Sequence, residues 1–233
     1  MTLEVLDLNA WYGESHILQG VTFDVRPGEI VALLGRNGVG RSTTLRAIMG
    51  DVERRGTVAF DGERLDRLPP HLIVQRGLAY VPEDRQVFAS LTVDQNLQLG
   101  NWARRSDGAF WTREEIYGRF PRLAERADVP AGALSGGEQQ LLTMSRSLLA
   151  NPRIMLVDEP TEGLAPAMVT LVRDLIVEIA RRGTAVLLVE QKLTIALRIA
   201  ARVLVMVHGR IVFQDTTAAF VAAPDIRKRY LEV

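Results

Sequence analysis

The stretch Gly35-Arg36-Asn37-Gly38-Val39-Gly40-Arg41-Ser42 decides the fold of this chain. It follows a continuous apolar run at residues 30–34, which is typical of a strand buried on both faces, and it precedes a helix-forming segment that Gly50 closes. Glycines let backbone N–H groups turn toward a phosphate, and the start of the helix adds partial positive charge. The stretch therefore predicts a phosphate-binding loop in which the Ser42 hydroxyl meets Mg²⁺, the alternative being an ordinary glycine turn before a helix.

Arg41 stands at the position where this loop pattern calls for lysine. The chain has only two lysines, Lys192 and Lys228, so a bias in base composition is the simplest source of the arginine. Arginine keeps the charge, but its longer planar fork changes the geometry of contact with the β- and γ-phosphates. Loss of one charge-assisted hydrogen bond costs about 1.5–3 kcal/mol, or about 10- to 150-fold in a rate or equilibrium constant. We therefore predict weakened, not abolished, ATP binding or turnover.

Two adjacent acids, Asp158 and Glu159, end an apolar run at residues 154–157. The run predicts a central strand whose end lies beside the phosphate loop. At that place Asp158 can hold Mg²⁺ directly or through water, and Glu159 can polarise an attacking water molecule. A strand that ends in a solvated acidic turn is the alternative, and the phosphate loop upstream favours the functional interpretation.

The length of 233 residues suits one large α/β domain or two small lobes. Short strand patterns at residues 3–8 and 21–25 predict a small N-terminal β region. Later strands alternate with helices, which implies a mostly parallel sheet covered on both faces. Residues 91–150 have helical patterns and no convincing strand, so we expect a helical lobe at 88–150 inserted into a core made of 1–87 and 151–233.

The composition argues against several classes of protein. Basic and acidic residues number 28 each, so the net charge of zero gives no electrostatic reason to expect nucleic acid as a partner. The absence of cysteine excludes disulfides and thiolate metal sites. Apolar stretches such as residues 185–189 are far shorter than the ~20 residues that span a bilayer, and we see no secretory signal. If the protein works at a membrane, we expect another chain to anchor it.

The segment Leu134-Ser135-Gly136-Gly137-Glu138-Gln139-Gln140 is the most specific in the chain. Ser135 and Glu138 have the spacing of a capping box, so a helix should begin here with N–H groups able to bind an anion. A simple helix cap is the alternative, but a double glycine followed by Gln139 and Gln140 is unusual for a cap alone.

With the phosphate loop, this signature segment and the apolar strand ending in two acids in that order, the chain resembles the ABC ATPase family over essentially its whole length. The resemblance implies a single ABC ATPase domain: a P-loop NTPase (RecA-like) α/β core with a mostly parallel sheet, a small N-terminal antiparallel β region and an inserted helical lobe. It also implies that ATP lies between the phosphate loop of one subunit and the signature of another, in a head-to-tail dimer. The residues it assigns to the nucleotide are Tyr12 (stacked on adenine), Gly35, Asn37, Gly38, Gly40, Arg41, Ser42, Thr43, Ser135, Gly136, Gly137 and Glu138.

Within the family, the chain is most similar to ATP-binding subunits of branched-chain amino acid importers. The residues that carry this likeness are Leu34-Gly35-Arg36-Asn37-Gly38, Tyr80-Val81-Pro82-Glu83-Asp84-Arg85, Glu162-Gly163-Leu164-Ala165-Pro166 and Leu188-Val189-Glu190-Gln191. Glu83 replaces the usual glutamine that senses Mg²⁺, Ala165 the usual aspartate, and Gln191 the usual histidine that touches the γ-phosphate, and all three look like habits of this subgroup. The resemblance thus implies Glu159, Gln191 and Glu83 as catalytic residues and Ser42, Asp158 and Glu83 around Mg²⁺.

The importer interpretation implies several partners. ATP would close the dimer with an identical or related ATPase subunit, and residues 88–99 would dock on a cytoplasmic helix of the permease subunits. A periplasmic substrate-binding protein would act indirectly, and the chain would lie peripherally on the cytoplasmic face of the inner (plasma) membrane. Three alternatives stay open: a urea or amide importer, a soluble ABC ATPase acting on nucleic acid or ribosomes, and a subunit with little catalysis because of Arg41.

Overall fold

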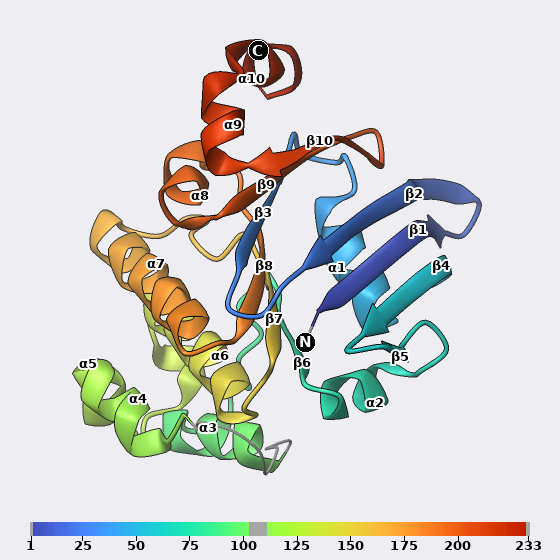
Figure 1. Cartoon of the computed structure of the whole chain (residues 1–233). Helices are drawn as coiled ribbons and strands as arrows, with labels where there is room; N and C mark the ends of the chain where they lie inside the picture. The colour runs from blue at the N-terminus through green and yellow to red at the C-terminus, as the bar shows by residue number, and fades with distance from the viewer. Residues whose placement is uncertain (1, 103–110, 232–233) are drawn as a thin grey trace.

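The computed structural model describes residues 2–102 and 111–231, which form two sheets and the helices around them (Figure 1). One sheet has six strands in the order β10-β9-β3-β8-β7-β6, and the other has four in the order β2-β1-β4-β5. Buried apolar side chains form two clusters, and alternate residues of the six-stranded sheet belong to one or the other: Ala32 and Leu34 to the first, Val31 and Leu33 to the second. The six-stranded sheet is therefore buried on both faces.

The six-stranded sheet is parallel except at one edge, where β10 pairs antiparallel with β9. Its inner strands are the continuous apolar runs of the sequence, which suits strands covered on both sides. The strands are β3 (Ile30–Gly35), β6 (Leu78–Val81), β7 (Ile154–Asp158), β8 (Ala185–Val189), β9 (Arg202–Val207) and β10 (Arg210–Thr216). The predicted mostly parallel α/β core is confirmed.

The four-stranded sheet is antiparallel and consists of β1 (Leu3–Tyr12), β2 (Ser15–Val25), β4 (Glu53–Phe60) and β5 (Glu63–Arg64). Strands β1 and β2 are longer than the strands predicted at residues 3–8 and 21–25. Register shifts interrupt the pairing of β1 with β2, so the alternation of buried and exposed residues breaks and hides the strand in the sequence. The start of β4 is polar in sequence. Its Arg54 side chain donates to the Ile48 carbonyl oxygen at 2.7 Å.

The segment between β6 and β7 is helical, as predicted. It contains α3 (Val93–Trp102), α4 (Arg113–Arg119), α5 (Pro121–Glu125), a 3-10 turn (Ala131–Ala133) and α6 (Gly136–Leu149). The division into a core and a lobe at 88–150 stays a prediction. Helix α6 packs on both α3 and β6, and one apolar cluster runs through the helices and the sheet.

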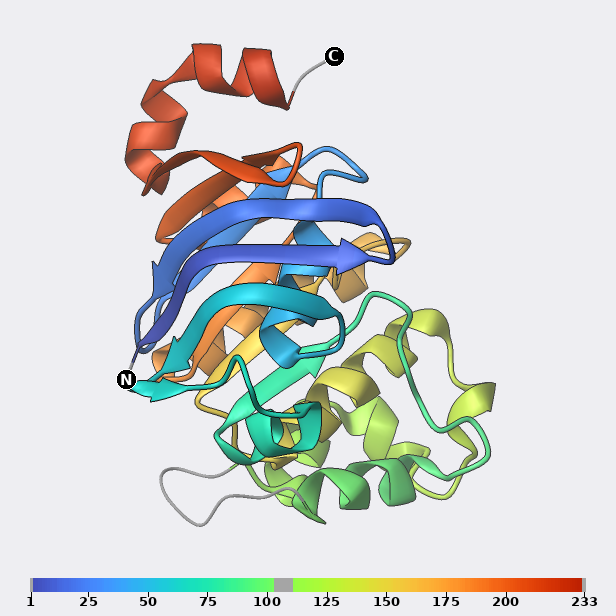
Figure 2. The same ribbon diagram turned by 90° about the vertical axis from the view of Figure 1, so that its right-hand side faces the viewer.

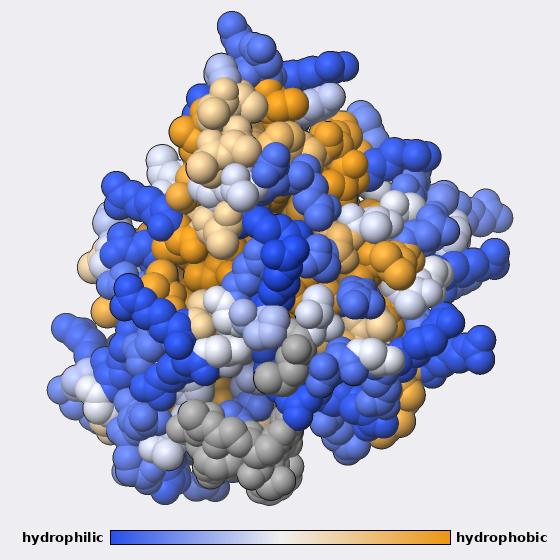
Figure 3. Space-filling model, viewed as in Figure 1, coloured by the Kyte–Doolittle hydropathy of each residue, from blue (hydrophilic) through white to orange (hydrophobic). Residues whose placement is uncertain are grey.

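The remaining helices cover the two faces of the six-stranded sheet (Figures 1 and 2). Helices α1 (Arg41–Met49) and α2 (Pro70–Gln75) share their cluster with the four-stranded sheet, whereas α7 (Pro166–Arg181), α8 (Leu193–Ile199) and α9 (Thr217–Ala222) contribute to the cluster on the opposite face. Helix α10 (Pro224–Tyr230) follows α9. Apolar side chains gather near α9, whereas hydrophilic ones cover α10, α4 and α5 (Figure 3). Within the ranges that the structure describes, no helix is long and apolar enough to cross a bilayer.

Candidate functional site

The loop between β3 and α1 has the backbone that its glycines make possible. Gly40 has a φ of 110°, in the left-handed region that favours glycine. A Cβ atom on Gly35 would lie 2.7 Å from the Met206 carbonyl oxygen and 2.8 Å from Val39 Cγ2, closer than packed atoms allow. These two positions explain why the pattern in the sequence needs glycine, and the helix that follows begins at Arg41.

A cavity of about 340 Å³ opens in front of this loop. It brings together nine of the predicted site residues that lie on four separate segments of the chain. Arg41 is the one cation among the described residues that line it, against three carboxylates. The lining residues are Ile17, Asn37, Gly38, Gly40, Arg41, Ser42, Thr43, Glu83, Glu159, Glu162 and Gln191.

Asp158 ends β7 and has a hydrogen-bond donor on each carboxylate oxygen. The Ser42 hydroxyl donates to Oδ1 at 3.0 Å, and the Tyr80 hydroxyl donates to Oδ2 at 3.2 Å. Burial raises the pKa of Asp158, and the two hydrogen bonds oppose that rise. Burial and the Asp158 charge in turn raise the pKa of Tyr80, which keeps its proton. The predicted proximity of Asp158 to the phosphate loop is confirmed.

Glu159 is paired with Arg41. Arg41 Nη2 donates to Glu159 Oε1 at 2.6 Å and to Asn37 Oδ1 at 3.0 Å. The Arg41 side chain is 4% exposed and that of Glu159 is 10% exposed, so water screens this pair little. Glu159 also has a left-handed backbone, with a φ of 42°, an uncommon conformation that non-glycine residues adopt at strained and functional positions. Burial raises the pKa of Glu159, and Arg41 opposes the rise.

The loop that carries Gln191 is held by the neighbouring buried Glu190. Glu190 Oε1 accepts from the backbone N–H groups of Gln191 and Lys192, each at 3.0 Å, and Oε2 accepts from the Thr161 hydroxyl at 2.8 Å. These bonds fasten the Gln191 loop to the segment that follows Glu159. The Gln191 side chain can thus line the cavity, as the sequence predicted.

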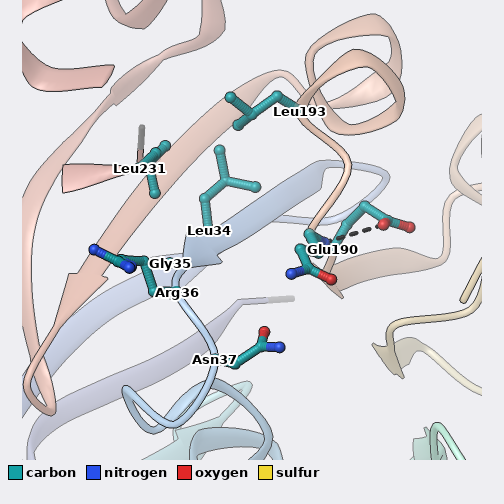
Figure 4. A pocket seen from close by; sticks show the side chains of 8 residues that line it. Leu34, Gly35, Arg36, Asn37, Glu190, Leu193 and Leu231 are labelled. Atoms are coloured by element: carbon teal, nitrogen blue, oxygen red, sulfur yellow. Dashed lines mark hydrogen bonds between the residues drawn. The ribbon is translucent and has the colours of Figure 1, made fainter. Parts of the chain in front are cut away.

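A second hollow of about 380 Å³ lies between the phosphate loop and the loop that carries Gln191, and residues of both loops line it. Figure 4 shows Leu34, Leu193 and Leu231 grouped on one side of it and Asn37 on the other. Leu231 follows α10, so the end of the described chain reaches the phosphate loop.

The signature segment begins α6 as predicted. Ser135 is the N-cap, and Glu138 Oε2 accepts from its backbone N–H at 2.9 Å and from its hydroxyl at 2.7 Å. Burial acts to raise the pKa of Glu138, but the bonds from Ser135 and the charges of Arg126 and Arg122 together lower that pKa. The Arg85 guanidinium covers Gly136 and donates from Nη2 to the Glu162 carbonyl at 2.8 Å. None of Ser135, Gly136 or Glu138 lines the cavity at the phosphate loop.

Two predicted residues take less central places. Tyr12 is 43% exposed and does not line the cavity, and its hydroxyl accepts from Arg46 Nη1 at 3.3 Å. Glu83 lines the cavity, but residues 2–102 and 111–231 contain no group of three or more acidic or histidine side chains that could hold a metal. The roles of Tyr12 at adenine and of Glu83 at Mg²⁺ stay predictions.

The sequence analysis did not assign Tyr80 or Arg46 to the site, although both could have been found. Tyr80 lies near the carboxyl end of β6 and is paired in register with Leu156 of β7, two residues before Asp158. The carboxyl ends of parallel strands meet at one edge of the sheet, so a tyrosine at this place reaches the same carboxylate. Arg46 is four residues after Ser42 on α1 and therefore shares its face.

A glycine loop joining β3 to α1, together with an acid pair that ends a neighbouring parallel strand, defines a P-loop nucleotide-binding protein. Residues 18–162 match the family model described as ABC transporter. The chain therefore belongs to the ABC transporter family as one of its ATP-binding subunits, which are ATPases and act with membrane-spanning subunits.

Individual relatives resemble the chain over nearly all of its length. It is 40% identical to the high-affinity branched-chain amino acid transport ATP-binding protein BraG of Pseudomonas aeruginosa, over 96% of this chain and 97% of that one. It is 35% identical to the probable branched-chain amino acid transport ATP-binding protein LivF of Archaeoglobus fulgidus, over 92% of each. A solved ATP-binding subunit of an ABC transporter superposes with a TM-score of 0.81 at 30% identity, over 98% of this chain and 93% of that one.

Proposed function

We propose that this chain hydrolyses ATP at the cavity in front of the phosphate loop to energise the import of branched-chain (hydrophobic) amino acids. The observation that carries the site is the Ser42–Asp158 hydrogen bond of 3.0 Å, which joins the loop to the acid pair. The proposed cargo rests on BraG and LivF, two branched-chain amino acid transport proteins that match the chain almost end to end.

Ser42 and Asp158 would hold Mg²⁺. Both present oxygen atoms, the ligands that Mg²⁺ prefers, and they already lie within hydrogen-bond distance of each other. When bound, the metal neutralises charge that develops on the phosphates. Tyr80 keeps Asp158 oriented by donating to its second oxygen, which leaves the first free to turn from Ser42 toward a cation.

Glu159 would accept a hydrogen bond from the attacking water molecule and then take its proton. Burial raises its pKa toward the working pH, which makes a carboxylate a better general base. Gln191 would donate its amide N–H to the γ-phosphate, and Glu83, which also lines the cavity, would contact Mg²⁺. The glycine backbone, Asn37, Arg41 and Thr43 would surround the phosphates, and Tyr12 would stack on adenine.

A second ATPase subunit, identical or related, would complete the site. Within one chain the signature at Ser135 lies outside the cavity, so its helix start is available to the nucleotide of another subunit. The N–H groups at the start of the 14-residue helix α6 suit a phosphate. The proposed dimer is head-to-tail, with two ATP sites that each use both chains.

The permease would dock beside the metal site. A hollow of about 620 Å³ is lined by Ser42, Tyr80, Glu83, Gln86 and Asp158, among other residues. Gln86 of this hollow lies two residues before the segment 88–99. The first residue of that segment, Phe88, is 52% exposed. A cytoplasmic helix of the permease seated here would touch Glu83 and sense the site, and the chain would then lie peripherally on the cytoplasmic face of the inner membrane.

Reconstitution tests the proposal. We expect the chain to hydrolyse MgATP, to lose this activity with Glu159→Gln, and to drive ATP-dependent uptake of leucine with the permease subunits and periplasmic binding protein encoded beside it. Uptake of urea in place of leucine would assign the alternative cargo. Absence of association with any membrane subunit would contradict the transport function.

A further inference from the structure

The two terminal nitrogens of the Arg41 guanidinium differ in their hydrogen bonds. Nη2 donates to both Glu159 and Asn37, at 2.6 Å and 3.0 Å. Nη1 is buried and has no hydrogen-bond partner in the described part of the chain. A buried N–H group without a partner is unfavourable, and such groups are rare in folded proteins. An acceptor from outside the chain would relieve it.

The surroundings of Arg41 indicate what that acceptor is. The fork lies at the first residue of α1 and lines the cavity together with Gly38 and Gly40. Its stem packs near Gly35, where an added Cβ atom would be 3.5 Å from Arg41 Cδ. An anion that enters the cavity therefore meets the side chain that carries this unpaired N–H group, and phosphate is the anion that the loop suits.

A lysine in this position could not make the same arrangement. Its ammonium group is a single nitrogen, so a phosphate and Glu159 would contact one atom. The arginine fork separates the two roles in space, although both acceptors draw on one charge. That charge is already largely neutralised by Glu159, at 2.6 Å.

We infer that Arg41 couples phosphate binding to the release of Glu159. Nη2 holds Glu159 while the cavity has no nucleotide, and Nη1 receives a phosphate oxygen that then draws the fork away from the carboxylate. Glu159 becomes free to act on water only when a phosphate is in place, and its pairing with Arg41 holds down nucleotide affinity beforehand. This inference rests on the proposed function and adds a positioning role for Arg41 that lysine would not supply.

Equilibrium affinity for a non-hydrolysable ATP analogue with Mg²⁺, measured by fluorescence, tests the coupling without turnover. Glu159→Gln removes the carboxylate charge and frees the fork, so we expect binding to tighten about five- to tenfold. Glu162→Gln removes an equal charge from the wall of the same cavity, and no hydrogen bond joins the Glu162 carboxylate to Arg41 in the structure. We expect that control to change affinity by less than about twofold.

A double-mutant cycle separates release of the fork from any other effect of Glu159→Gln, such as firmer dimer closure. In the Arg41→Met background, which has no charge or N–H donor left to pair with residue 159, Glu159→Gln should change affinity by less than about twofold. Arg113→Met is the matched control for the arginine substitution, because Arg113 also pairs with an acid, Asp94 at 3.0 Å, and does not line the cavity. It should leave nucleotide affinity unchanged.

Three outcomes are distinct. Tightening by Glu159→Gln that depends on Arg41 supports the inference. Equal tightening by Glu162→Gln, equal tightening by Glu159→Gln in the parent and in Arg41→Met, or no tightening at all overturns it. The Glu162→Gln comparison decides even if Arg41→Met does not fold or does not bind the analogue. Failure of the parent chain to bind the analogue would instead contradict the proposed function.

Discussion

Replacing Tyr80 by phenylalanine removes one oxygen atom from the site and leaves the aromatic ring in place. That oxygen donates to Asp158 Oδ2 at 3.2 Å, while Ser42 donates to Oδ1 at 3.0 Å. Without Tyr80 the buried carboxylate keeps one donor, and its pKa, already raised by burial, should rise further. A carboxylate that is less well oriented and more easily protonated is a poorer ligand for Mg²⁺.

The size of the effect follows from the bond that is lost. A hydrogen bond to a charged group contributes about 1.5–3 kcal/mol, or about 10- to 150-fold in an equilibrium constant. Partners that orient metal ligands are worth about 10- to 100-fold in metal affinity. The Tyr80–Asp158 bond, at 3.2 Å, is longer than a strong bond between a hydroxyl and a carboxylate. We therefore expect Tyr80→Phe to weaken Mg²⁺ binding about tenfold, at the lower end of both ranges.

The assay is a Mg²⁺ titration of ATP binding at fixed nucleotide, followed by the fluorescence of a labelled ATP. Affinity in the absence of Mg²⁺ should stay within about twofold of the parent. Tyr117→Phe is the matched control, because the Tyr117 hydroxyl donates to Asp94 at 2.8 Å outside the site. An unchanged Mg²⁺ midpoint in Tyr80→Phe, or an equal shift in Tyr117→Phe, would refute the role of Tyr80.

Three further predictions concern the same site. Gly35→Ala should lower the stability of the nucleotide-free chain by about 1–3 kcal/mol in urea unfolding, because its Cβ atom would press on the Met206 carbonyl; unchanged stability would refute the close approach. Asp158→Asn should raise the melting temperature at neutral pH, since burial disfavours the carboxylate, and should abolish the Mg²⁺ dependence of ATP affinity; a lower melting temperature contradicts the first part. Because burial raises the pKa of Glu159 above 4.5, kcat/KM should fall on acidification at a pH above that value. The same shift means that the Glu159 contribution to stability is greatest below the unfolded pKa and is lost as the pH rises through the folded pKa, which urea unfolding across pH would measure.

The parts of the fold that follow from strong local patterns could be predicted from the sequence. The apolar run before Gly35 and the cap at Ser135 specify a buried strand and a helix start by themselves, and both are confirmed. The full lengths of the strands in the four-stranded antiparallel sheet were harder to predict, because register shifts along β1 remove the alternation that marks a strand. Helices α9 and α10 were not predicted, since each is short and has at most one fully buried residue.

The site was predictable where sequence order fixes spatial order. Parallel strands bring Asp158 to the phosphate loop, and the Ser42–Asp158 bond confirms that step. The Arg41–Glu159 pair joins residues 118 positions apart through the rotamers of two long side chains. No pattern in the sequence encodes such rotamers, because packing around the stem of Arg41 and the left-handed backbone of Glu159 select them.

The central claim is that the phosphate loop of one chain and the signature of another enclose a single ATP. Mixing two inactive variants tests it most directly: Ser42→Ala, which damages the loop, and Gly136→Asp, which places a negative charge at the start of α6. A random mixture should form mixed dimers with one intact site each and recover about a quarter of the parent ATPase activity. A mixture no more active than its components, or full activity of Gly136→Asp alone, would contradict the claim.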